Sequence, residues 1–170
     1  MVEGQLRGEG KMRIYRCSNK TYQNYYQNYL EERNVALHSD PSRIPSILYH
    51  ATYRPYLDSI LKKGLQSGIS PANWEFSENV VYLSSDIDEA ISYTETSDIV
   101  PEDYLDQIVI LAIDVSQLDV SKLVIDENVL YNMPLDTSTE DNIRNKNIPD
   151  KESLFEYHGV IPPSAIKLAK

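Results

Sequence analysis

The feature that most constrains this chain is an apolar run at residues 107–115, QIVILAIDV, the most apolar stretch in the sequence. A continuous run of aliphatic and β-branched residues of this length is typical of a strand that is buried on both faces. We therefore expect it to be the central strand of a sheet.

Shorter apolar runs bounded by turn residues predict the strands around it. Residues 118–125 are expected to form a short strand or a turn, and 165–168 a last edge strand. The remaining predicted strands are residues 47–50, 80–83, 154–157 and 160–161.

Two short helices are expected between these strands. The first begins near Pro55 and ends at Gly64, because proline suits the first helical position and glycine suits the residue that stops a helix. The second runs through Tyr93 and opens with Ser85 and Asp88 in the spacing of a capping box. Short strands mixed irregularly with short helices predict an α+β fold, with the sheet split into two packed pieces.

The first 45 residues differ in charge from the rest. Residues 1–45 carry a net charge of about +2 and residues 46–170 about −12, from a total of −10. We interpret 1–45 as an N-terminal arm with a strand at 12–17 and a tyrosine-rich helix at 21–33, and 46–170 as the main domain. The arm either packs its tyrosines on the main domain or recognises a substrate or partner.

Composition excludes several classes of protein. The single cysteine, Cys17, excludes an internal disulfide and a multi-thiolate zinc site, and fits a reducing compartment. No stretch approaches the roughly 20 apolar residues of a membrane helix. The net charge of −10 argues against binding nucleic acid through a general basic surface. We expect a cytoplasmic protein with no membrane partner; its oligomeric state is left open.

Polar residues at strand ends are the candidates for chemistry. His50 closes one predicted strand, Tyr82 lies in another, Tyr93 follows on a helix, and Glu156 lies in a late strand. Taken alone, each is better explained as a structural residue than as a functional one. Residues 126–152, just before the Glu156 strand, are polar and too long for an ordinary connection.

Together these residues resemble the ADP-ribosyltransferase superfamily, in the branch that shares a His-Tyr-Glu triad with diphtheria toxin and the poly(ADP-ribose) polymerases. The resemblance covers residues 46–170. It rests on Leu48-Tyr49-His50-Ala51-Thr52, on Lys63-Gly64-Leu65, on the ten residues between Tyr82 and Tyr93, on Phe155-Glu156-Tyr157, and on Gly159-Val160-Ile161-Pro162-Pro163.

The resemblance implies a fold, an activity and a set of roles. The fold is a split β-sheet core with flanking short helices, and the activity is transfer of ADP-ribose from NAD+ without a metal. Glu156 is the catalytic carboxylate, and Tyr82 and Tyr93 flank nicotinamide. His50 binds the adenosine-side ribose, and the backbone of Ala51 and the side chain of Thr52 are further NAD+ contacts. Residues 126–152 select the acceptor.

The sequence departs from the family pattern at three positions. Ala51 replaces the commoner glycine, and Ala90 stands where the family often has a serine, whose contact Ser84 or Ser92 is expected to supply. Leu154 stands where arginine-specific relatives carry Glu or Gln, which disfavours arginine as the acceptor.

We expect a mono-ADP-ribosyltransferase of the kind found among bacterial toxins or phage effectors. Its expected acceptor is a protein, and a nucleic acid is a further possibility through the basic arm. The alternatives are an NAD+ glycohydrolase, a relative of RNA 2′-phosphotransferases, and a catalytically silent binding module. A hydrolase built on Cys17 with His38 or His158 has only the presence of those residues in its favour.

Overall fold

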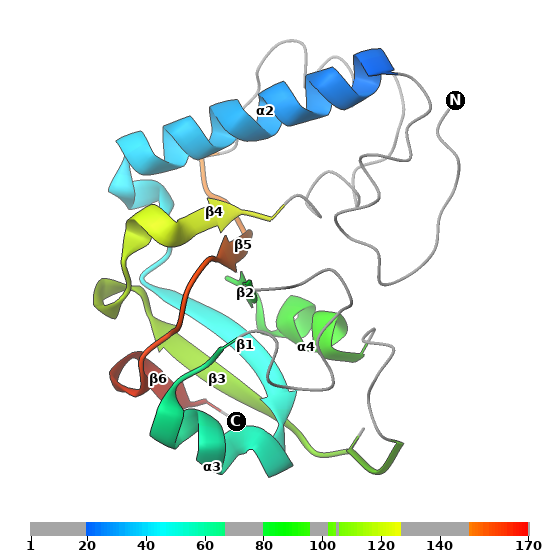
Figure 1. The fold of residues 1–170 in the computed structure, drawn as a ribbon, viewed down its shortest axis with the longest axis vertical. Helices are drawn as coiled ribbons and strands as arrows, with labels where there is room; N and C mark the ends of the chain where they lie inside the picture. The colour runs from blue at the N-terminus through cyan, green and yellow to red at the C-terminus, as the bar shows by residue number, and fades with distance from the viewer. Residues whose placement is uncertain (1–19, 67–79, 96–101, 105, 127–149, 170) are drawn as a thin grey trace.

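The computed structural model describes residues 20–66, 80–95, 102–104, 106–126 and 150–169, with side chains from residue 27 (Figure 1). The predicted strand at 12–17, Cys17 and most of the polar segment 126–152 lie outside these residues.

The fold is α+β, as predicted, and is built on one antiparallel sheet. The sheet has six strands in the order β4-β5-β2-β1-β3-β6. The run predicted to be the central strand forms β3, an inner strand that pairs with β1 and β6. It lies next to the edge strand β6, so the centre of the sheet is formed by β2 and β1 instead. The strands are β1 Ile47–Tyr53, β2 Val81–Ser84, β3 Ile108–Asp114, β4 Leu123–Ile125, β5 Leu154–Tyr157 and β6 Ile166–Leu168.

The two halves of the sheet, β4-β5-β2 and β1-β3-β6, pair with each other at one position only. β1 pairs with β3 along all seven of its residues but with β2 at one position only, Tyr49 opposite Ser84. The prediction of two separate packed pieces is therefore wrong as stated, because hydrogen bonds join all six strands into one sheet. The sheet nevertheless opens between β1 and β2 beyond Tyr49.

One predicted strand is absent, and the choice between strand and turn at residues 118–125 is settled. Residues 160–161 form no strand; Ile161 makes an isolated bridge to Leu65, because Pro162 and Pro163 lack the N–H groups that would continue the ladder. Residues 118–122 form a turn and a 3₁₀ helix, so that β4 begins only at Leu123.

In the part of the chain that the structure describes, the α-helices α2, α3 and α4 cover the sheet (Figure 1). Buried residues of α2 and α3 join the main core on one face, with Leu48, Leu111 and Phe155. Ala90 of α4 packs on the other face against Ala51. Among the described helices, none combines the length and apolar character needed to cross a membrane. The helices are α2 Lys20–Ser39, α3 Arg54–Lys63 and α4 Ile87–Glu95.

The helix α2 runs six residues beyond the predicted end at residue 33. Leu37 lies in this extension and is fully buried in the main core. Asn34 accepts a hydrogen bond from Ile125 N–H at 2.8 Å, and His38 Nε2 lies 2.7 Å from the Leu123 carbonyl oxygen. These contacts stabilise the last turns of α2 along the edge strand β4, which local sequence patterns could not reveal.

The ends of α3 follow the predicted signals. Pro55 lies in the first turn, and Gly64 ends the helix with φ of 92°. A side chain at Gly64 would bring its Cβ to 2.5 Å from the Ile161 carbonyl oxygen, so both the backbone angle and the space require glycine there.

The start of α4 differs by one residue from the prediction. The N-capping residue is Asp86, whose Oδ1 accepts a hydrogen bond from Glu89 N–H at 2.9 Å. Ser84 supports the same turn, since its Oγ accepts from Asp86 N–H and donates to Glu89 Oε2. The pair Ser85 and Asp88 is therefore not the capping box, because carboxylate oxygens compete well for the free N–H groups of the first turn.

Candidate active site

Antiparallel pairing brings Tyr82 and Glu156 together. Tyr82 of β2 stands directly opposite Glu156 of β5, and Glu156 is in turn opposite Val124 of β4. Residues that face each other in an antiparallel pair point to the same side of the sheet. Glu156 is only 5% exposed although it is an acidic residue. A buried carboxylate therefore lies beside the Tyr82 side chain.

Helix α4 adds a second tyrosine on this side. The ring centroids of Tyr82 and Tyr93 are 6.0 Å apart, and the ring planes are inclined by 42°. The hydroxyl of Tyr93 donates a hydrogen bond to Asp126 Oδ2 at 2.9 Å. Burial and the neighbouring Asp126 carboxylate raise the pKa of Tyr93 well above its usual value, so this hydroxyl stays protonated.

Asp126 is a component of the site that we did not predict. It follows β4 directly, its N–H donates to the Leu154 carbonyl at 3.0 Å, and the residue is fully buried. Alternation along β4 and this bond place it on the same face as Glu156. A polar residue at the end of a short apolar run was the signal available in the sequence, and it is also the signal that singled out His50. The strand that His50 was predicted to close continues to Tyr53, so His50 lies within β1.

His50 lies where the sheet opens. If the β1–β2 ladder continued beyond Tyr49, Ala51 would stand opposite Tyr82. The ladder stops instead, and the carbonyl of Tyr82 accepts a hydrogen bond from His50 Nδ1 at 2.8 Å. The imidazole thus replaces a backbone donor at the point where the two halves of the sheet separate.

The bond to Tyr82 sets the tautomer of His50. A carbonyl only accepts, so Nδ1 carries the proton. Burial lowers the pKa of His50, and the Tyr82 carbonyl opposes that shift only in part, so the ring is neutral at pH 7. In that state Nε2 is a hydrogen-bond acceptor.

The other predicted NAD+ contacts already have partners within the protein. The Ala51 carbonyl accepts a hydrogen bond from Thr94 Oγ1 at 2.8 Å. The fully buried Ser84 supports the start of α4, as described above. Thr52 is 7% exposed and, by the alternation of β1, points to the opposite face of the strand from Ala51. A carbonyl oxygen has two lone pairs, so Ala51 can still accept a second bond.

His158 is a further neighbour of Glu156 that we did not assign. Its Nε2 lies 3.0 Å from Glu156 Oε2, and its side chain is 46% exposed. The signal in the sequence was its place two residues after Glu156, since such residues share one side of an extended chain.

The structure thus places Tyr82, Tyr93, Glu156 and Asp126 on the α4 side of the sheet, with His158 next to Glu156. It links His50 to this group through the Tyr82 carbonyl, although alternation along β1 puts the His50 side chain on the opposite face from Ala51, the face that holds Leu111. Among the residues that the structure describes, no group of three His, Cys, Asp or Glu side chains could hold a metal ion. Comparison of the sequence with protein-family models and with curated proteins finds no match.

Proposed function

We propose that this chain is a mono-ADP-ribosyltransferase that transfers ADP-ribose from NAD+ to a macromolecular acceptor, a protein rather than a nucleic acid. The observation that carries the proposal is the buried Glu156 directly opposite Tyr82, whose ring contacts Tyr93 and whose carbonyl is bound by His50. These four residues are among those that carry the resemblance to the His-Tyr-Glu branch.

Glu156 is suited to the chemistry of NAD+ cleavage. The bond between nicotinamide and ribose breaks with its electron pair leaving on nicotinamide, which leaves positive charge on the ribose. A nearby carboxylate, shielded from water, stabilises that charge better than an exposed carboxylate would. The acceptor then bonds to the ribose carbon and gives up a proton, which Glu156 can accept.

Tyr82 and Tyr93 are suited to bind the nicotinamide ring, which is a flat cation before cleavage. The 6.0 Å between the ring centroids shows the rings in contact with each other. A third ring between them needs two stacking distances, about 7 Å in total. Binding therefore requires the rings to separate by about 1 Å and to become more nearly parallel.

Ala51 offers a polar contact on the α4 side of the sheet, and His50 offers one where the sheet opens between β1 and β2. The neutral imidazole of His50 offers Nε2 as an acceptor for a ribose hydroxyl. The Ala51 carbonyl has one lone pair left for an amide N–H of nicotinamide.

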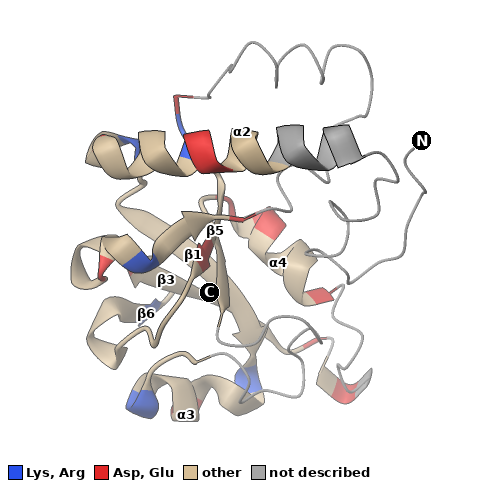
Figure 2. Ribbon diagram, turned by 45° about the horizontal axis from the view of Figure 1, so that its top comes forward, with Lys and Arg blue, Asp and Glu red and all other residues tan. Residues whose placement is uncertain are grey.

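The charge around the site favours a protein as the acceptor. Helix α4, which carries Tyr93, contains three acidic residues and no basic one, whereas basic residues mark the ends of α3 (Figure 2). An acidic helix beside the site repels a polyanion such as nucleic acid. The acidic residues of α4 are Asp88, Glu89 and Glu95.

The test is incubation of the purified protein with labelled NAD+ and a cell lysate, beside the variant Glu156→Gln. We expect a labelled protein band with the wild type and none with the variant. Glu95→Gln is the matched control, because Glu95 is an exposed carboxylate on α4 that the site does not use.

Other outcomes separate the alternatives. Release of nicotinamide without a labelled macromolecule indicates an NAD+ glycohydrolase, and label on nucleic acid alone contradicts the choice of a protein acceptor. If the wild type consumes no NAD+, the proposal is wrong and a binding module becomes the better explanation.

A further inference from the structure

The side chain of His158 is exposed to solvent, and its imidazole contacts the buried carboxylate of Glu156. The two groups are 3.0 Å apart, and the exposed fractions of the two side chains are 46% and 6%. The proposed chemistry needs Glu156 ionised, and an ionised carboxylate can only accept a hydrogen bond, so in that state Nε2 of His158 carries the shared proton.

The backbones of both residues are held in place independently of this contact. His158 N–H donates to the Lys122 carbonyl at 2.9 Å, just beyond the end of β5. Glu156 is paired with Tyr82 on one side and Val124 on the other. With its backbone fixed, the Glu156 carboxylate changes position by rotation about its side-chain bonds. A hydrogen bond from His158 favours one of the staggered rotamers.

We infer that His158 is a positioning residue for Glu156, whose carboxylate it holds in one orientation on the side of the sheet shared with Tyr82. The inference rests on the proposed function, because that orientation matters to turnover only if the carboxylate faces the reacting ribose. A misplacement of about 1 Å in a reacting group can lower a rate by about 100-fold. Loss of the His158 donor should therefore lower kcat, while KM for NAD+ changes little because the other contacts remain.

The experiment compares His158→Leu with His158→Gln in the full chain. Leucine removes the donor, whereas the side-chain amide of glutamine can place an N–H group close to the position of Nε2. The matched control is His38→Leu, because His38 is another histidine whose Nε2 makes a hydrogen bond within the protein, to the Leu123 carbonyl. Nicotinamide release gives kcat and KM, and urea unfolding reports the stability of each variant.

We expect His158→Leu to lower kcat by about 10- to 100-fold, with KM within about threefold of the wild type, and His158→Gln to recover most of the loss. His38→Leu should lower stability and leave kcat unchanged. Equal kcat in wild type and His158→Leu, while Glu156→Gln is inactive, overturns this inference and leaves the proposed function standing. A loss of kcat in His38→Leu equal to that in His158→Leu also overturns it, because a structural effect then explains both. An inactive wild type overturns the proposed function and this inference together.

Discussion

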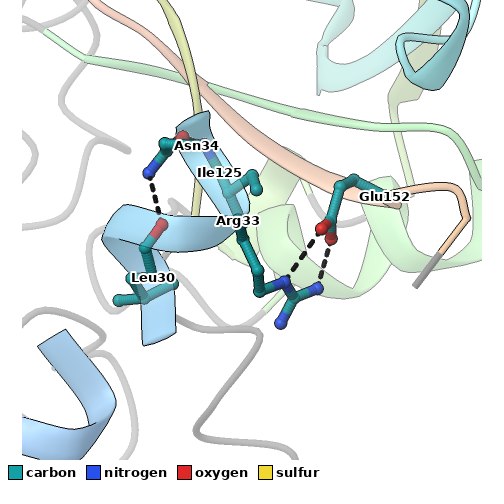
Figure 3. A network of polar contacts seen from close by, with 5 residues as sticks. All are labelled: Leu30, Arg33, Asn34, Ile125 and Glu152. Atoms are coloured by element: carbon teal, nitrogen blue, oxygen red, sulfur yellow. Dashed lines mark hydrogen bonds and ion pairs between the residues drawn. The ribbon is translucent and has the colours of Figure 1, made fainter. Parts of the chain in front are cut away.

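Replacing Arg33 by methionine should destabilise the protein strongly, because it leaves Glu152 buried without its cation (Figure 3). Both residues are 4% exposed. Nε of Arg33 donates to Glu152 Oε1 at 2.8 Å, and Nη2 donates to Oε2, so that the pair is bidentate. Removing one partner of a buried pair costs about 3–5 kcal/mol. For a chain of this size, that corresponds to a decrease in Tm of about 6–20 °C.

The double variant Arg33→Met/Glu152→Leu should recover most of this loss. Replacing both members of a buried ion pair by apolar side chains is often neutral or stabilising. One contribution is not recovered, because the Arg33 guanidinium lies 5.2 Å from the centroid of the Tyr29 ring. A cation–π contact of this kind contributes about 0.5–2 kcal/mol. We therefore expect the double variant to lie within about 2 kcal/mol of the wild type.

Urea unfolding followed by far-UV circular dichroism measures the free energy of unfolding for the wild type, both single variants and the double variant. Arg43→Met is the matched control, since Nε of Arg43 is 3.7 Å from an exposed Asp40 carboxylate and such surface pairs contribute only about 0–1 kcal/mol. Equal losses in Arg33→Met and Arg43→Met would refute the reasoning. A double variant as unstable as the sum of the two singles would refute it as well, because the cycle would then show no coupling.

Three further predictions concern pH. Burial raises the pKa of Tyr93, so the folded state resists its ionisation and the free energy of unfolding should fall as pH rises above about 10. In urea unfolding measured from pH 9 to 11, Tyr93→Phe should show a smaller decrease than the wild type. Burial lowers the pKa of His50, so the free energy of unfolding should fall as pH drops below about 6.5, the ordinary pKa of histidine. The variant His50→Asn keeps an N–H donor for the Tyr82 carbonyl but does not titrate in this range, so it should remove that part of the loss. An unchanged pH profile in the variant would contradict the assignment. Hydrogen bonds from Ser116, through its hydroxyl and its N–H, lower the pKa of Asp114, so Ser116→Ala should raise that pKa toward its ordinary value in a carboxyl NMR titration, and no change would show that the side-chain bond does not form in solution.

Local sequence signals predicted the elements that depend on neighbours along the chain. The strand at 154–157 was placed with its observed bounds, and Gly64 ends α3 as expected. The errors at Ser85 and at the end of α2 have different causes. Capping was misassigned by one residue because several polar side chains compete for the same N–H groups. The extension of α2 depends on burial of Leu37, which no neighbouring residue indicates.

The candidate site was predicted only in part. His50, Tyr82, Tyr93 and Glu156 were singled out from strand ends and family spacing, and the structure places all four in one region. Asp126 was not predicted individually, because its partner Tyr93 lies 33 positions away and only the packing of α4 on the sheet brings the two together.

By itself, the sequence determined which segments become strand or helix in most cases, and a few of their ends, such as Gly64 after α3, since proline, glycine and apolar runs act on the backbone around them. Only the tertiary structure decided which side chains meet. Tyr93 and Asp126 are 33 positions apart, Thr94 and Ala51 43 positions, and Arg33 and Glu152 119 positions. Contacts of this kind depend on strand order and on the packing of α2 and α4 against the sheet, and neither property is encoded in any local pattern of residues.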